Sequence, residues 1–393
     1  MTGGRRTTAT GPLADVTVLE LGGIGPLPLF AMLFADLGAR VVRVDPAGPA
    51  YGAIGSHLWI FRGQESVTID LRQPRGQELV LQLVERADVL VEGYRPGVAE
   101  RLGVGPDACL ARNPRLVYGR MTGWGRGGPL SDRGGHDINY IGLTGALEAM
   151  GPPGTPPPVP LNLVGDFGGG AMMLAMGVLA ALHERGQSGH GQVVEAAMSD
   201  GTLALMALFY AMRDAGHWVD ARGANQPQGF APFYRCYETS DGQYLAVGAV
   251  EAKFYAELLD ALGFDPGLAE TQHDRAQWPA LMPVFEEAFR SRTRREWEDI
   301  FATRDACVTP VLSMVEAPMH PHNAQRDCFV DANGHVQVAP PVRFGRTPAS
   351  IGDPAPDAGD DNARVLAELG IDDAELAKLH ADGVVGRPEG ETT

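Results

Sequence analysis

The amino-acid sequence predicts an α/β protein with a parallel sheet and a second, smaller α+β domain. Near the N-terminus an apolar strand at 16–21, a helical pattern ending at Gly38 and an apolar strand at 40–45 form a strand–helix–strand unit, which implies a parallel sheet. Further segments extend this pattern: strands at 66–72, 88–92, 116–120 and 192–197, and a helix at 74–87. At 393 residues the chain is longer than one hydrophobic core usually organises, so two domains are expected.

Composition and charge exclude several classes of protein. The chain carries 32 Lys+Arg against 49 Asp+Glu, a net charge of −17, and no basic run exceeds a pair, so we expect neither nucleic acid nor an anionic membrane as partner. The four cysteines are far apart and lack metal-ligand spacing, which predicts a reduced cytoplasmic protein without a metal site. Residues 1–11 lack the apolar core of a signal peptide, and we expect no segment long and apolar enough to cross a bilayer.

Residues 117–170 are the stretch that we predict to hold the active site. His136 follows two glycines that let the chain turn sharply, and Asp137 comes next as the expected helix N-cap. Asp166 precedes a run of glycines and an apolar helical pattern that ends near Glu184, so it is expected at a helix N-terminus, where a carboxylate is favoured. The alternative is that Asp166 only caps that helix and His136 is an ordinary loop residue.

The loop after the first strand invites comparison with dinucleotide-binding proteins. Asp45 closes the second strand, as an acidic residue does in those proteins, but Pro28 stands where their motif requires a third glycine. A nicotinamide site is therefore disfavoured, although the carboxyl ends of the strands are still where a nucleotide-bearing ligand is expected. Arg95 and Arg101 flank a predicted helix start, where they could bind phosphate or simply be surface charges.

The second half of the chain predicts the smaller domain. An apolar helix at 200–215 must be buried by something, for which another subunit is one candidate, and the methionines that precede and follow Asp200 suit either core packing or an adaptable surface for an apolar ligand. A hairpin at 233–238 and 244–250 and helices at 252–262, 278–290 and 294–301 follow. The segment 318–361 is expected to be mostly irregular, before helices at 362–369 and 373–379. The expected domains are 1–198 with 335–393, a linker at 199–231, and 232–334.

Several motifs together resemble a known family. They are Met121–Gly125, Gly135–Tyr140, Leu161–Leu163 with Asp166-Phe167, Val247–Glu251 and Asp305–Val311. In this order they resemble the α-methylacyl-CoA racemases of the family III CoA-transferase superfamily, from about Pro12 to Val385.

The resemblance implies a Rossmann-like CoA-binding domain built from both chain ends, a small domain between them, and an interlocked homodimer. It implies that His136 and Asp166 are the acid/base pair and that Glu251 supports His136. It also implies an acyl-CoA substrate of fatty acid metabolism, no separate cofactor, and these CoA contacts: Ile69, Asp70, Leu71, Arg72, Gly93, Tyr94, Arg95, Arg101, Gly135, Asp137, Ile138, Asn139 and Tyr140.

The expected reaction interconverts (2R)- and (2S)-2-methylacyl-CoA thioesters by proton transfer through an enolate. One alternative is a family III CoA-transferase with Asp166 as nucleophile, disfavoured by the presence of His136 and the lack of the glycine-run loop of those enzymes. Another is a non-catalytic CoA-binding protein, against which the presence of two proton carriers argues. The chain departs from the pattern where Pro46 and Gln64-Glu65 replace expected basic residues, and again in the loop 225–231.

Overall fold

The computed structural model describes residues 10–47 and 58–387 and divides into two compact units. Unit 1 comprises Met1–Thr144, Pro160–Leu205 and Pro321–Thr393, and unit 2 comprises Gly145–Val159 and Met206–His320. These boundaries differ from the expected domains: 145–159 belongs to unit 2, 321–334 belongs to unit 1, and the expected linker is divided, with 199–205 in unit 1 and 206–231 in unit 2. The expectation that residues 1–11 lack the apolar core of a signal peptide concerns mainly residues 1–9, which lie outside the described residues.

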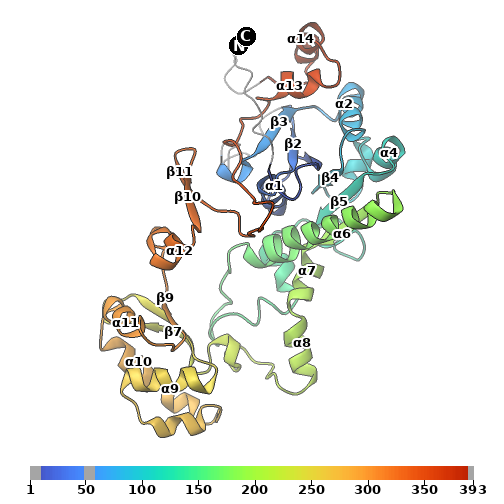
Figure 1. Ribbon diagram of the computed structural model, residues 1–393. Helices are drawn as coiled ribbons and strands as arrows, with labels where there is room; N and C mark the ends of the chain where they lie inside the picture. The colour runs from blue at the N-terminus through green and yellow to red at the C-terminus, as the bar shows by residue number, and fades with distance from the viewer. Residues whose placement is uncertain (1–9, 48–57, 388–393) are drawn as a thin grey trace. The chain divides into compact units, whose positions relative to one another are not determined.

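Unit 1 contains a six-stranded parallel sheet (Figure 1). Its strands are β1 Thr17–Leu21, β2 Arg40–Asp45, β3 Gln64–Thr68, β4 Val89–Glu92, β5 Val117–Thr122 and β6 Val193–Ala197. The order β3-β2-β1-β4-β5-β6 is the doubly wound arrangement, in which the direction of winding reverses between β1 and β4. The predicted parallel sheet is confirmed, but β3 begins and ends earlier than expected, so residues 69–72 follow the strand.

Helices cover both faces of this sheet. One apolar core joins it to α2 Pro74–Val84, α4 Pro106–Arg112, α13 Asn362–Ala367 and α14 Asp373–Ala381, and the other joins it to α1 Pro26–Asp36 and α6 Met172–Ser188. The remaining helical elements of unit 1 are η1 Trp59–Phe61, α3 Val98–Arg101, α5 Asp137–Gly142, the π-helix η2 Leu163–Ala171, α7 Met198–Leu205 and α12 Pro321–Gln325.

Two sequence expectations need correction in this part of the chain. The single helix expected at 200–215 is two helices, α7 in unit 1 and α8 Ala207–Asp214 in unit 2, with Met206 between them. The segment expected to be irregular contains an antiparallel hairpin, β10 Phe329–Ala332 and β11 His335–Val338. Its turn is Asn333-Gly334 with φ of 56° and 76°, the dipeptide that favours a two-residue hairpin turn.

The helical segment Leu163–Ser188 corrects the expectation that no segment is long and apolar enough to cross a membrane. It has 26 residues and contains an 18-residue window with a mean hydropathy of 1.6, so it passes by length and composition. In this structure one face of it is buried, where Leu174, Ala175, Val178 and Ala181 pack in the core that includes β5, while most of the apolar window is not buried.

Unit 2 is a small α+β unit, and the predicted hairpin and the helices after it are present. Its antiparallel sheet has the order β7-β8-β9, with β7 Tyr234–Glu238, β8 Tyr244–Gly248 and β9 Val308–Pro310. An aromatic core of Phe233, Tyr237, Tyr255, Phe285 and Trp297 joins the sheet to the helices. Those helices are α9 Ala252–Leu262, α10 Trp278–Arg290 and α11 Arg294–Phe301, with 3-10 turns at η3 Gln226–Gln228, η4 Pro266–Thr271 and η5 Ala317–Met319.

Candidate active site

The carboxyl ends of β1 and β4 form the place in unit 1 where this kind of sheet binds ligands, because the winding reverses there. Two glycines let the loops after these strands approach the first turn of α1. A Cβ added at Gly23 would lie 2.7 Å from the Leu27 Cδ1, and one at Gly93 would lie 3.0 Å from the same atom. Larger residues would push both loops away from α1.

Asp166 lies at this end of the sheet. A Cβ added at Gly25, the residue before α1, would be 3.1 Å from the Asp166 Oδ2. Asp166 is in the first turn of the π-helix, whose N-cap is Asn162, so the alternative that Asp166 merely caps a helix is wrong. π-Helical turns are rare and recur at functional sites.

The carboxyl of Asp166 is held in an environment that favours its protonated form. Burial raises its pKa, and the nearby charge of Asp137 raises it further. The Asn162 Nδ2, which donates to the Asp166 Oδ2 at 3.2 Å, and the charge of His136 act in the opposite direction. Asp137, the residue after His136, accepts from the Asp166 backbone N–H at 2.7 Å, so the chain around His136 lies beside Asp166. The acid/base roles of His136 and Asp166 stay predictions.

His136 is the N-cap of α5, and its side chain is exposed. The sequence had pointed to Asp137 as the cap, which is wrong by one residue, because Asp137 is the first residue of the helix and its carboxyl group faces the backbone of Asp166. The Asn139 Oδ1 accepts from the His136 backbone N–H at 3.0 Å and so fixes the start of the helix.

Tyr140 anchors α5 to the preceding loop. Its hydroxyl donates to the Gly135 carbonyl, and its ring meets the Trp124 ring edge-to-face with centroids 4.8 Å apart. A Cβ added at Gly123 would lie 2.2 Å from the Tyr140 ring, so only glycine fits there. The residues predicted as CoA contacts in 135–140 therefore form one packed unit, from which Ile138 is partly exposed.

Arg95 connects the loop after β4 to this unit. Its Nη2 would lie 3.1 Å from a Cβ added at Gly134, and its charge lowers the pKa of Tyr140 while burial raises it. Arg101 lies at the end of α3 and turns back toward Gly97. Within residues 10–47 and 58–387, neither arginine forms an ion pair, so both cations are available to an anionic ligand.

The other predicted CoA contacts, Ile69–Arg72, follow the edge strand β3. Ile69 and Leu71 are buried, and Ile69 pairs with Val385. The Arg72 side chain is exposed and forms an ion pair with Asp70 at 2.8 Å, which lowers the pKa of Asp70 to about 2. Arg72 is thus the member of this group whose charged end could reach a ligand, and it already has a partner.

The structure explains why Gln64 and Glu65 stand where basic residues were expected. Gln64 and Glu65 are buried in β3, where Gln64 accepts from Arg43 at 3.2 Å and Glu65 pairs with Arg40 at 2.8 Å. Arg62, the basic residue that the chain keeps, is buried and pairs with Asp36 at 2.6 Å. It belongs to the core of unit 1 and cannot contact a ligand without breaking that pair.

Glu251 lies in unit 2, where it is the exposed N-cap of α9 and makes no capping hydrogen bond through its side chain. Its charge contributes to raising the pKa of Cys307, although burial is the larger cause. His136 belongs to unit 1, and the predicted support of His136 by Glu251 stays a prediction.

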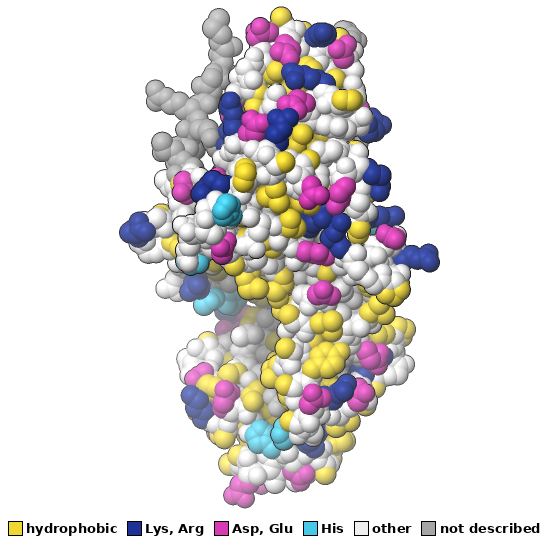
Figure 2. Space-filling model, turned by 90° about the vertical axis from the view of Figure 1, so that its right-hand side faces the viewer, with side chains coloured by type: hydrophobic (Ala, Val, Ile, Leu, Met, Phe, Trp, Pro, Cys, Tyr) yellow, Lys and Arg dark blue, Asp and Glu magenta, His cyan; other side chains and the backbone are white. Residues whose placement is uncertain are grey.

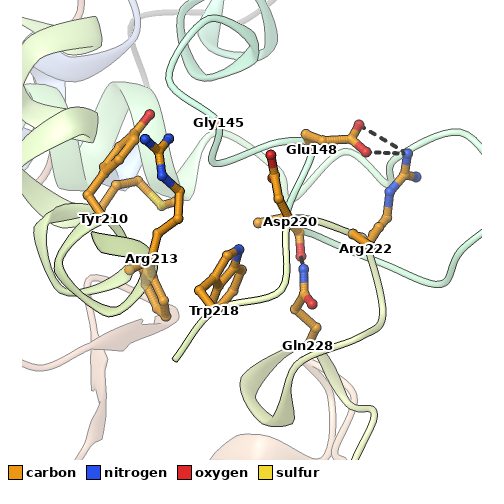
Figure 3. Close-up of a pocket in the computed structure, with 12 residues that line it drawn as sticks. Gly145, Glu148, Tyr210, Arg213, Trp218, Asp220, Arg222 and Gln228 are labelled. Atoms are coloured by element: carbon orange, nitrogen blue, oxygen red, sulfur yellow. Dashed lines mark hydrogen bonds and ion pairs between the residues drawn. The ribbon is translucent and has the colours of Figure 1, made fainter. Parts of the chain in front are cut away.

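Unit 2 also contains two hollows that the sequence did not predict. The first, of about 150 Å³, is lined by Tyr210, Arg213 and Trp218 on one side, with Asp220 and the Glu148–Arg222 pair on the other (Figure 3). The second, of about 820 Å³, lies over the β7-β8-β9 sheet and is lined by Phe230, Tyr234, Val247 and Cys307 among others. Neither contains His136 or Asp166.

The fold and this constellation define a doubly wound α/β enzyme with an imidazole and a protonatable carboxyl at the carboxyl end of its sheet. The chain belongs to CoA-transferase family III, whose family model matches residues 13–362.

Relatives and solved structures agree with this assignment. The chain is 41% identical over 375 residues to the alpha-methylacyl-CoA racemase of Mus musculus, covering 95% of this chain and 97% of that one, and 40% identical to that of Homo sapiens over the same length. The crystal structure of Rv3272 from M. tuberculosis matches with a TM-score of 0.75 at 30% identity, covering 91% of this chain and 99% of that one. A CAIB/BAIF family protein from Brucella suis, 24% identical with a TM-score of 0.79, shares the fold.

Proposed function

We propose that this protein is an isomerase that interconverts (2R)- and (2S)-2-methylacyl-CoA thioesters. The observation that carries the proposal is the placement of Asp166, which is partly buried, with a raised pKa, at the carboxyl end of the sheet, where its backbone N–H donates to Asp137, the residue after His136. The roughly 40% identity to racemases over nearly the whole chain supports the same reaction.

The two side chains suit a two-base mechanism. The proton α to a thioester is weakly acidic, so its removal requires a positioned base and hydrogen-bond donors for the enolate oxygen. His136 removes the proton from one epimer while protonated Asp166 delivers a proton to the opposite face, and for the other epimer the roles reverse. Backbone N–H groups in the first turn of α5, which starts directly after His136, are the proposed donors for the enolate.

The environment of Asp166 favours this reaction over CoA transfer. A carboxylate nucleophile must be ionised before it can form a mixed anhydride with the acyl group. Burial and the charge of Asp137 both raise the pKa of Asp166, which reduces the ionised fraction and suits a proton donor. The transferase reaction remains the alternative that the experiment below distinguishes.

The CoA moiety is proposed to bind along the carboxyl end of the sheet. Arg95 and Arg101, which have no carboxylate partner within the described residues, would contact its phosphates, and Gly135–Tyr140 would face the thioester end. Three strand spacings, about 14 Å, separate the ends of β3 and β4. An extended CoA could span this length from Gly93–Arg95 to Arg72.

We also propose a homodimer located in the cytoplasm, without a separate cofactor. Large apolar side chains are exposed on consecutive helices of the single chain: Met172 and Met176 on α6, Leu203 and Leu205 on α7, and Leu208 on α8. Figure 2 shows hydrophobic side chains at the surface in patches between charged groups. Exposed apolar side chains in such numbers are typical of subunit interfaces.

The test is α-proton exchange in D2O with a single epimer of a 2-methylacyl-CoA, followed by NMR. The wild-type enzyme should incorporate deuterium at Cα and lose stereochemical purity. The His136→Ala variant should lose racemisation, and it should lose deuterium incorporation for the epimer whose proton faces His136. The Asp166→Asn variant should show the converse preference. If the wild type exchanges no α-proton but moves CoA to an added free acid, the transferase alternative is correct.

A further inference from the structure

The carboxyl group of Asp137 is bonded to the backbone of Asp166 in unit 1. The Asp137 Oδ1 accepts from the Asp166 N–H at 2.7 Å, although the two residues belong to different helices. A Cβ added at Gly165 would lie 2.6 Å from the same oxygen, so the chain before Asp166 is shaped to admit the Asp137 carboxyl group.

A simpler role for Asp137 is to stabilise α5, because an acidic residue in the first turn interacts favourably with a helix N-terminus. Two observations exceed that role. Asp137 is only 7% exposed, whereas a first-turn carboxylate that serves its helix alone can remain in water. Its Oδ2 is also buried without a hydrogen-bond partner in the described part of the chain, so one oxygen of this carboxyl group is left unsatisfied.

We propose that Asp137 is a positioning residue that anchors the backbone of Asp166 and keeps a negative charge beside the Asp166 carboxyl. The proposal rests on the proposed function, since it concerns the surroundings of the residue that donates the proton in that reaction. A neighbouring negative charge disfavours ionisation of a carboxyl group. The direction of the effect on Asp166 is the one expected, because Asp137 is among the groups that raise its pKa.

The other groups around Asp166 fix how the pH dependence should be interpreted. The charge of His136, the N-cap of α5, lowers the pKa of Asp166, and the charge of Asp166 raises the pKa of Tyr140 in α5. Asn162, the N-cap of the π-helix, donates a hydrogen bond to Asp166, and Gly25 before α1 carries no charge. Arg95 faces Tyr140 from the loop after β4. Burial is the largest cause of the raised pKa of Asp166, and Asp137 is the neighbouring carboxyl group that raises it further.

Both productive forms of the proposed site carry the same number of protons: neutral His136 with protonated Asp166, or protonated His136 with ionised Asp166. The pH profile of kcat/KM should be bell-shaped and the same in both directions, and its acid limb reports protonation of both groups together. Removing the charge of Asp137 lowers the pKa of Asp166, so the acid limb should move to lower pH in both directions.

The test is the Asp137→Asn variant, which keeps an oxygen acceptor for the Asp166 N–H and removes the charge. Its matched control is Asp107→Asn, which makes the same change in the first turn of α4, where the side chain is exposed. The acid limb should move to lower pH in the first variant and stay in place in the control. An unmoved acid limb in Asp137→Asn would overturn the proposal and leave Asp137 with its helix-stabilising role.

A second measurement does not depend on turnover. Carboxyl 13C NMR of protein labelled at the Asp side chains, with Asp166→Asn used to assign the resonance, follows the titration of Asp166 directly. Its midpoint should fall in Asp137→Asn, and in Asp137→Ser if the first variant does not fold. If the wild type fails to racemise but this midpoint falls, the proposed function is wrong and the charge coupling is right. If the wild type racemises but the midpoint stays in place, the coupling is wrong.

Discussion

Glu20 is a buried carboxyl group in the middle of the unit 1 sheet. It is opposite Arg43 in the register of β1 and β2, is fully buried, and both its oxygens lack a hydrogen-bond partner in the described residues. Burial raises its pKa to about 8, although the charge of Arg43 opposes this. The folded protein therefore holds a proton at Glu20 that the unfolded chain releases at much lower pH.

This predicts a loss of stability on raising the pH. Between about pH 4.5 and about pH 8 the native state binds more protons at Glu20 than the unfolded state, so the free energy of unfolding should fall across this window, by on the order of 4 kcal/mol. Glu20→Gln should remove most of this decline, as measured by urea denaturation at several pH values. The exposed Glu270→Gln is the control, and equal pH slopes in the wild type and Glu20→Gln would contradict the prediction.

Arg95 and Arg72 differ in what their charges already contact, although both were predicted from the same resemblance. Arg95 forms no ion pair in the described part of the chain, whereas Arg72 pairs with Asp70. A lost charge-assisted hydrogen bond costs about 1.5–3 kcal/mol, so Arg95→Ala should raise the KM for an acyl-CoA by about 10- to 100-fold. Arg72→Ala should change it by less than about 5-fold. Steady-state kinetics with both variants test this, and a larger effect at Arg72 would reverse the assignment.

At the scale of single residues, the sequence was informative where a motif carries chemistry. His136 and Asp166 could be selected because each follows or precedes glycines beside an apolar pattern, and the backbone of Asp166 donates to Asp137, the residue after His136. Their catalytic roles stay predictions. The environment that tunes Asp166 could not be predicted, because it depends on contacts from Asn162 and Asp137 that only the folded chain creates. Nor does a sequence reveal that Arg62 is buried in an ion pair.

At the scale of elements, the π-helix and α7 pack through their backbones. A Cβ added at Gly201 would lie 1.9 Å from the Gly169 carbonyl oxygen, and one at Gly169 would lie 2.7 Å from the Met198 carbonyl oxygen. This close contact positions the segment that carries Asp166, and it tolerates no side chain at either glycine.

Gly201→Ala should therefore destabilise the protein by about 3 kcal/mol and reduce activity, because the two segments must separate. Gly186→Ala is the matched control: Gly186 is exposed in α6 and has no atom within 4 Å of an added Cβ. That change should stabilise the protein by about 0.5–1 kcal/mol. Urea denaturation of both variants measures the difference, and equal effects would show that the contact of α7 with the π-helix is loose.

The elements with a strong periodic pattern were predicted correctly, and the elements that were not predicted have physical reasons. The breaks at Met206 and at the π-helix leave no mark in apolar periodicity, because both neighbouring helices are apolar. The hairpin at 329–338 was missed in a Pro-rich region, although its Asn333-Gly334 turn was a usable signal.

At the scale of the whole molecule, the chain passes from one unit to the other four times, and this route was only partly predictable. The segment Gly145–Val159 has no periodic pattern that assigns it to unit 2. It is held there by side-chain contacts distant in sequence: Arg222 pairs with Glu148 and donates to the Thr155 carbonyl, and Gln228 donates to the Ala149 carbonyl.

The exposed apolar side chains of the helices are the feature of the whole molecule that most strongly predicts association with another chain. α8 has no buried residue in the single chain, and Leu208 is 65% exposed. Burying such a side chain contributes about 1.5–3 kcal/mol, so an isolated chain that leaves several of them in water is expected to associate. A dimer would bury this surface and give α8 the partner that the sequence already required.

Leu208→Asp should weaken the proposed dimer, because it places a charge where an apolar contact is expected. Val284→Asp, on the exposed side of α10, introduces the same charge at another exposed apolar residue of unit 2 and serves as the control. Light scattering coupled to size-exclusion chromatography should find a dimer for the wild type and the control, and monomer or aggregate for Leu208→Asp. A monomeric wild type at micromolar concentration would remove the basis of the dimer and leave the apolar surface of α6, α7 and α8 to another partner.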